Sequence, residues 1–118
     1  MSDMQGESGF LKDAVGPKGL FAVFEDDGET GYLYLYEPNG RGVISHLRIY
    51  VRSPEVNVAE KDVSVEWSEG FTKYGVRIWG KFRGIVDVCS SRDVRILLEG
   101  KHTLGISDSS WLDGFAHT

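Results

Sequence analysis

Carboxylates gather in one short stretch of the chain, FEDDGET, where Glu25, Asp26, Asp27 and Glu29 surround Gly28. Such oxygens suit a hard cation such as calcium, but the stretch lacks the alternating ligands and the closing glutamate of an EF-hand loop. Asp-Gly is itself a common turn, because both residues tolerate positive φ. The sequence therefore favours a solvated turn and predicts no metal site. Asp26, Asp27 and Glu29 are left as candidate contacts for a basic partner.

Three tyrosines follow at alternate positions in YLYLYE. Side chains alternate along a strand, so Tyr32, Tyr34 and Tyr36 share one face, with Leu33 and Leu35 on the other. Tyrosine is enriched in recognition surfaces, because its rigid ring and polar tip give contact area at small entropic cost. Two alternatives follow for the tyrosine face. It binds a partner, or it covers a core with its hydroxyls reaching water.

Groups suited to catalysis are scattered. Cys89 is the only cysteine, so no intramolecular disulfide forms, and His46, His102 and His117 lie far apart in the sequence. The chain has no H-E-x-x-H, G-x-S-x-G, P-loop or dinucleotide-binding motif. The sequence predicts no catalytic residue and no cofactor.

Short β-strands are expected to carry these residues. The 15 glycines and many aromatic residues, with little helical periodicity, predict an all-β antiparallel barrel or sandwich of about seven or eight strands. Residues 1–18 are expected to be a flexible N-terminal tail and residues 19–118 a single β domain. In SDSSWLDGF, good N-cap residues precede Trp111 and Phe115, which predicts a short C-terminal helical turn that plugs one end of the barrel or sandwich.

Turn residues divide the strands. Asn39-Gly40 predicts a type I′ hairpin, and a last hairpin is expected around Gly100-Lys101. Residues 76–88 are interpreted as one long strand bent at its glycines, with two strands around GKFRG as the alternative. In VISHLRIYV, alternation predicts two faces. One holds Val43, Ser45, Leu47, Ile49 and Val51, and the other holds Ile44, His46, Arg48 and Tyr50.

The net charge of −5 is uneven along the chain, since the first forty residues carry eight acids against Lys12 and Lys18. An acidic protein repels phosphate backbones, so nucleic acid is disfavoured as a partner. If the chain does bind nucleic acid, the candidate surface is a basic patch made of Lys73, Arg77, Lys81, Arg83, Arg92 and Arg95. No secretory signal and no membrane-spanning run is recognised, and a cytoplasmic location is expected.

The stretch FEDDGETGYLYLYE, Trp67 and the later ISDSSW together resemble a small bacterial family of single-domain proteins of unknown function. The resemblance covers most of the chain from about Gly19. It implies a bacterial, stand-alone protein, and it assigns no activity, cofactor, substrate or functional residue.

Charge and aromatic content favour a non-enzymatic protein-binding module whose tyrosine face and acidic loop meet a basic protein, in one version a toxin that it neutralises. The alternative is a small-molecule-binding β-barrel or enzyme with an interior pocket lined by Trp67, Trp79 or Phe82. A third possibility is a homo-oligomer that buries the tyrosine face.

Overall fold

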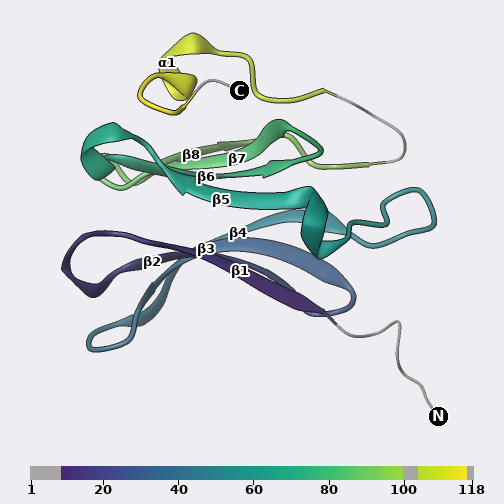
Figure 1. The fold of residues 1–118 in the computed structure, drawn as a ribbon, viewed down its shortest axis with the longest axis horizontal. Helices are drawn as coiled ribbons and strands as arrows, with labels where there is room; N and C mark the ends of the chain where they lie inside the picture. Colours follow the sequence, from purple (N-terminus) through teal and green to yellow (C-terminus); the bar gives the residue numbers. More distant parts are fainter. Residues whose placement is uncertain (1–8, 100–103, 117–118) are drawn as a thin grey trace.

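Two four-stranded antiparallel sheets face each other in the computed structural model, which describes residues 9–99 and 104–116 (Figure 1). Sheet A has the order β1-β2-β3-β4 and sheet B the order β5-β6-β7-β8. The strands of sheet A are β1 (Phe10–Val15), β2 (Phe21–Asp26), β3 (Thr30–Glu37) and β4 (Gly42–Val51). Those of sheet B are β5 (Val63–Trp67), β6 (Lys73–Ile78), β7 (Lys81–Asp87) and β8 (Arg92–Arg95). The predicted all-β class and strand number are confirmed, and the arrangement is a sandwich rather than a closed barrel.

Short helical turns complete the described part of the chain. They are three 3-10 turns, η1 (Pro17–Gly19), η2 (Glu60–Asp62) and η3 (Glu69–Phe71), and the α-helix α1 (Ser109–Leu112). Asp108 caps α1 by accepting a hydrogen bond from the Ser110 backbone N–H at 2.9 Å, so the predicted C-terminal turn is confirmed. No helix in the described ranges has the length and apolar character needed to cross a membrane.

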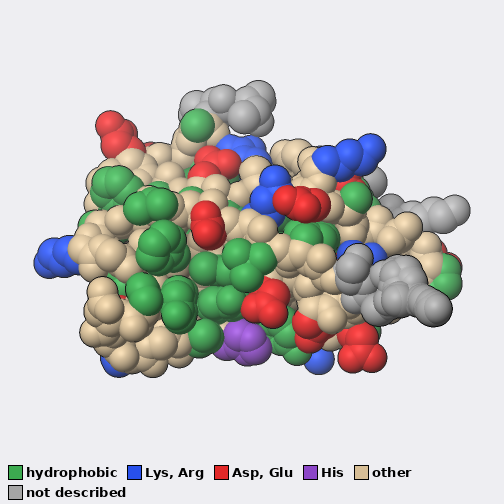
Figure 2. All heavy atoms as spheres, turned by 60° about the horizontal axis from the view of Figure 1, so that its bottom comes forward, with side chains coloured by type: hydrophobic (Ala, Val, Ile, Leu, Met, Phe, Trp, Pro, Cys, Tyr) green, Lys and Arg blue, Asp and Glu red, His purple; other side chains and the backbone are tan. Residues whose placement is uncertain are grey.

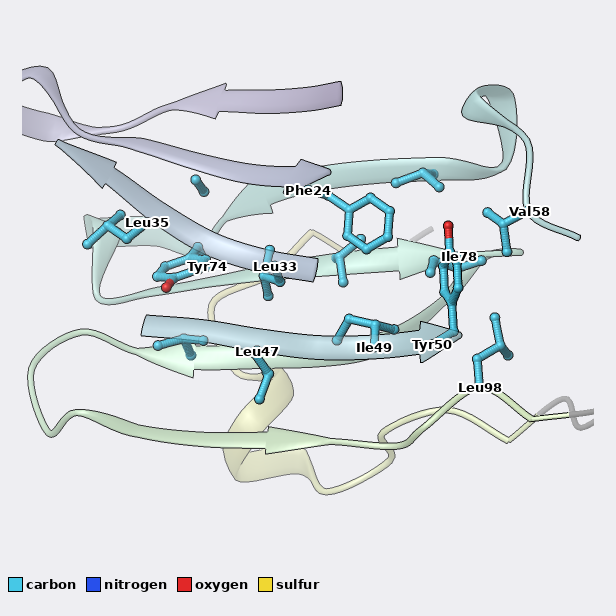
Figure 3. Close-up of a cluster of buried hydrophobic side chains, with 14 of the residues drawn as sticks. Phe24, Leu33, Leu35, Leu47, Ile49, Tyr50, Val58, Tyr74, Ile78 and Leu98 are labelled. Atoms are coloured by element: carbon cyan, nitrogen blue, oxygen red, sulfur yellow. The ribbon is translucent and has the colours of Figure 1, made fainter. Parts of the chain in front are cut away.

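Apolar side chains from both sheets fill the space between them (Figure 3). Leu33 and Leu35 of β3 point into this core, which places the tyrosines of the same strand on the outer face of sheet A. The main buried residues of the core include Phe24, Leu33, Leu47, Ile49, Tyr50, Tyr74, Val76, Ile78 and Leu98. Packing of this kind supplies most of the stability of a sandwich.

Strand β1 corrects the predicted tail. Residues 10–15 pair in register with β2, with Phe10 opposite Asp26 and Val15 opposite Phe21. Phe10 packs on the core, while Leu11 and Val15 on the other face remain exposed. The apolar residues of FLKDAV stand in two pairs around Lys12 and Asp13 and do not alternate, so the pattern does not predict a strand, and β2 supplies its hydrogen bonds.

The predicted alternation of β4 is kept from His46 to Ile49 and is wrong towards both ends of the strand, because the register against β3 shifts at two places. Ser45 adopts a left-handed conformation (φ 57°), which lets one extra residue enter the strand opposite Tyr34. As a result Ile44 and Leu47 both face the core, whereas His46 lies on the outer face beside the tyrosines.

One predicted turn and one predicted strand also differ from the structure. The β3–β4 connection is a hairpin, but positive φ occurs at Gly42 and not at Asn39 or Gly40. Residues 76–88 contain the end of β6 and the whole of β7, which are separate strands, so the bent-strand interpretation is wrong and the alternative of two strands holds. Trp79 and Gly80 both have positive φ and make the tight turn between them, as a type I′ hairpin requires.

A C-terminal strap, residues 104–116, covers the outer face of sheet B (Figure 1). Its buried Ile106 and Phe115, with Trp111 and Leu112, pack on Phe82, Ile85, Val94 and Ile96. The strap therefore lies across a sheet face instead of plugging an end, and residues 104–107 form no strand. The expected turn at Gly100-Lys101 lies outside the described residues. The sandwich thus has three layers, and sheet A is the outer layer opposite the strap.

Candidate functional site

The outer face of sheet A is built from rows of side chains that lie across its strands. The register aligns Val15, Phe21, Tyr36 and Val43 in one row, Asp13, Val23 and Tyr34 in the next, and Leu11, Glu25, Tyr32 and Arg48 in the third. The first row is aliphatic and aromatic, the second contains the carboxylate of Asp13, and the third contains both the carboxylate of Glu25 and the cation of Arg48. Asp13 is therefore the carboxylate in the row next to the apolar one, and Glu25 shares its row with a basic residue.

A hollow of about 360 Å³ lies on this face. The sheet A groove, as we name it, is lined by Leu11, Asp13, Phe21, Val23, Tyr34, Tyr36 and Val43. Its floor is buried, since Val23 is 4% exposed, whereas Leu11 and Val43 at its margins are 52% and 54% exposed. Figure 2 shows hydrophobic side chains gathered on this side of the molecule with acidic side chains beside them. Contiguous exposed apolar surface of this kind marks binding sites more often than isolated apolar residues do.

The three predicted tyrosines have different environments on this face. Tyr34 is 8% exposed, and its hydroxyl donates to Glu25 Oε1 at 2.9 Å. Burial, and then the hydrogen bond to Glu25, raise the pKa of Tyr34 to about 12. Tyr32 stacks on His46 with ring centroids 4.2 Å apart, while Tyr36 is 39% exposed. Tyr34 and Tyr36 line the groove and Tyr32 lies outside its lining.

Carboxylates near the groove are not equivalent. Glu25 accepts the Tyr34 hydroxyl, and Glu37 pairs with Arg41 at 3.1 Å. The hydrogen bonds from Arg41 lower the pKa of Glu37. Asp13 lines the groove itself, and no hydrogen bond or ion pair joins its carboxylate to any of the described residues.

The predicted acidic loop divides into a buried and an exposed part. Asp26 is 2% exposed and ends β2, so its carboxylate does not face solvent. Asp27 is exposed and accepts the backbone N–H groups of Thr30 and Glu29 at 2.9 Å each, which lowers the pKa of Asp27. Glu29 is exposed. Within the described ranges, no three His, Cys, Asp or Glu side chains are grouped as metal ligands.

Asp26 belongs to a network that sequence patterns did not indicate. The hydroxyl of buried Tyr50 donates to Asp26 Oδ2 at 2.5 Å, and Arg52 pairs with the same carboxylate at 2.8 Å. Arg52 also donates to the carbonyl of Val58. The Tyr50 ring lies so close to Gly31 that a Cβ there would be 2.6 Å from it. The network ties the β2–β3 hairpin to the segment before β5, and its residues lie too far apart in sequence for a motif to reveal it.

The three aromatic residues predicted to line an interior pocket do not converge. Trp67 lies opposite Tyr74 at one end of the β5–β6 pair, and Trp79 follows the opposite end. The Trp67 indole donates to the carbonyl of Ala14 at 3.0 Å. Phe82 packs under the strap with its ring centroid 4.5 Å from that of Phe115. Trp79 is 40% exposed, and Phe82 lines a hollow of about 480 Å³ between sheet B and the strap that includes neither tryptophan. The sheet A groove uses none of the three.

Basic residues of the predicted patch hold the strap. Buried Lys73 donates from Nζ to the carbonyls of Ser110 and Trp111 at 3.2 and 3.1 Å. Arg83, 1% exposed, donates to carbonyl oxygens of Ile78 and Leu104, and Arg77 donates to that of Ala116. Desolvation lowers the pKa of Arg83. Much of the basic surface suggested by the sequence is therefore committed to internal contacts.

Comparison with known proteins identifies a family. A family model described as an uncharacterised protein conserved in bacteria, DUF2251, matches residues 4–93. The match confirms the resemblance to a bacterial family of unknown function, and it includes every residue of the sheet A groove, while the strap lies beyond it. No curated protein and no solved structure matches the chain.

Proposed function

We propose that this chain, which belongs to the DUF2251 family of uncharacterised proteins conserved in bacteria, is a non-enzymatic protein-binding module that uses the sheet A groove to hold a basic partner protein. The observation that carries the proposal is the difference between the two sheets. The outer face of sheet B is covered by the strap, whereas that of sheet A exposes an apolar groove.

The size of the apolar surface favours a protein over a small molecule. Leu11, Val15 and Val43 are each more than half exposed and lie at the margins of the groove or beyond it. A small ligand in the hollow would leave much of this surface in water, whereas a protein would cover the whole face. Tyr36 adds an exposed aromatic ring of the type that anchors such contacts.

Charge favours a basic partner. The chain carries −5, and Asp13, Glu25 and Glu37 lie on or beside the groove. Complementary charge speeds encounter and rejects acidic competitors. A basic toxin that this chain neutralises is one partner of this class. A cytoplasmic location belongs to the same proposal, because the single Cys89 is an exposed free thiol and suits a reducing compartment.

Two other functions compete with this proposal. The groove volume of about 360 Å³ is also large enough for a small organic molecule. A second copy of the chain would also cover the apolar surface, but it would bring the acidic groups of two molecules together, which costs free energy.

Partner capture with a matched pair of variants tests the proposal. Val43 and Val51 both lie in β4 and are both 54% exposed, but only Val43 lines the groove. Val43→Asp places a charge in the groove, and Val51→Asp places the same charge outside it. After circular dichroism shows that both variants fold, immobilised proteins are exposed to bacterial lysate and the retained proteins are identified.

The expected result is a basic protein held by wild type and by Val51→Asp but lost by Val43→Asp, with the same ranking when the purified pair is measured by calorimetry. If every retained protein binds both variants equally, the groove is not the recognition surface. If ultracentrifugation instead shows a dimer of the chain that only Val43→Asp dissociates, the face is a homo-oligomer interface and the proposal is wrong.

A further inference from the structure

We infer that the partner segment seated in the sheet A groove is extended, with a Lys or Arg side chain that pairs with Asp13 and an apolar side chain two positions away on each side. The inference rests on the proposed function and specifies the chemistry of the partner.

Asp13 is the group that demands a cation. Its carboxylate lines the groove, yet no hydrogen bond or ion pair joins it to the described residues. In the free protein water solvates this charge, since Asp13 is exposed. A partner that covers the groove removes that water, and an unpaired buried carboxylate is costly. A partner therefore binds well only if it brings a donor to this position.

The other carboxylates beside the groove have partners already. Glu25 accepts the Tyr34 hydroxyl at 2.9 Å, and Glu37 accepts the Arg41 backbone N–H and side chain at 3.1 Å each. A cation drawn to either residue competes with an existing hydrogen bond. Asp13 offers both carboxylate oxygens without such competition.

The surroundings of Asp13 determine what flanks the cation. Leu11 and Val15 precede and follow it at alternate positions of β1 on the same face, and both are more than half exposed. Alternate side chains of an extended chain are about 7 Å apart, so a segment running along β1 repeats the same spacing. An apolar–x–basic–x–apolar pattern thus matches Leu11, Asp13 and Val15 in either chain direction.

The next strand favours a long basic side chain. Asp13 lies opposite Val23, and Val23 opposite Tyr34, so the floor beside the carboxylate is apolar and then aromatic. The methylene groups of Lys or Arg pack on such a surface while the charged end reaches the acid. A second copy of the chain would present a like charge here if it used the same face.

NMR titration of the isotope-labelled full chain tests the inference with three defined probes. They are the capped peptides Val-Ser-Lys-Ser-Val, Val-Ser-norleucine-Ser-Val and Val-Ser-Glu-Ser-Val, which differ in the central side chain alone. Norleucine keeps the apolar stem of lysine and removes the charge. Amide shifts locate the site, and their dependence on peptide concentration gives each Kd.

We expect shifts centred on β1, β2 and β3 around the groove, and a Kd for the Lys peptide roughly two- to fivefold lower than for the norleucine peptide, as an exposed ion pair gives. The Glu peptide binds most weakly. Asp13→Asn is expected to abolish the difference between Lys and norleucine. Glu55→Gln, which removes an exposed charge distant in sequence from the groove, is expected to preserve it.

Equal Kd values for the Lys and norleucine peptides with the wild-type chain would overturn the inference, yet leave the groove as a protein-binding surface. Absence of groove shifts with all three peptides would also overturn it, while the Val43→Asp and Val51→Asp comparison decides the proposed function separately. Groove shifts that appear on raising the protein concentration without peptide would identify a second copy as the occupant and overturn both proposals.

Discussion

Two buried tyrosine hydroxyls in the same core are expected to affect stability in opposite directions. Tyr50 is 1% exposed and Tyr74 is fully buried. The Tyr50 hydroxyl donates to Asp26, whereas the Tyr74 hydroxyl has no hydrogen-bond partner among the described residues. Burial raises the pKa of both phenols, and Ser45 opposes the rise at Tyr74, although its hydroxyl does not reach hydrogen-bonding geometry. Replacing each tyrosine with phenylalanine removes one oxygen from similar surroundings.

The magnitudes follow from what each oxygen contacts. Tyr50→Phe loses a hydrogen bond to a charged acceptor, which lowers the free energy of unfolding by about 2 kcal/mol, since Arg52 still pairs with Asp26. Tyr74→Phe removes a desolvated hydroxyl that makes no bond, so the free energy of unfolding rises by about 1 kcal/mol. The two variants should therefore differ by about 3 kcal/mol.

Urea denaturation followed by tryptophan fluorescence measures this difference. With a slope of about 1–3 kcal/mol per molar urea, the midpoints of the two variants should be separated by roughly 1–3 M, with wild type between them. If Tyr74→Phe lowers the midpoint as much as Tyr50→Phe, the Tyr74 hydroxyl must form a hydrogen bond, and Ser45 is the group to examine. That result would refute the assignment of the Tyr74 hydroxyl as unsatisfied.

The remaining predictions concern the strap, the Tyr34 hydroxyl on sheet A and the buried carboxylate of Asp26. Phe115→Ala should lower the free energy of unfolding by about 3–5 kcal/mol, because Phe115 is 5% exposed, whereas Leu104→Ala, at a 65% exposed position of the same strap, should change it by under about 0.5 kcal/mol. Thermal denaturation compares the two variants, and equal effects would contradict the packing of the strap. Raising the pH from 10 towards 12 should destabilise the protein, because the unfolded tyrosine ionises near pH 10 while Tyr34 in the fold, with its pKa of about 12, stays protonated. Each such tyrosine lowers the free energy of unfolding by at most about 1.4 kcal/mol per pH unit, and the same dependence on pH in Tyr34→Phe would count against the raised pKa of Tyr34. Asp26→Asn should cost about 3 kcal/mol by leaving Arg52 without its buried carboxylate, and a calorimetric loss below about 1 kcal/mol would show that the network contributes little.

Local chemistry in the sequence determined several elements directly. Alternation in YLYLYE separates Leu33 and Leu35 from the tyrosines, because a strand has a period of two residues, and the structure keeps that separation. Asp108 begins the C-terminal helical turn because its side chain accepts a backbone N–H that the helix cannot bond. Such features depend on neighbouring residues alone, so the sequence predicts them without knowledge of the fold.

Tertiary structure decided which face is the core and where the groove lies. The left-handed Ser45 and the bulge beside it place Ile44 in the core and Val43 on the tyrosine face, a change that no alternating pattern of β4 predicts. β1 becomes a strand because a sheet edge pairs with it. The groove combines residues of four strands, and it is open because the strap covers the other sheet. Whether an apolar face is buried or free depends on what packs against it, and those contacts join residues that are distant in the sequence.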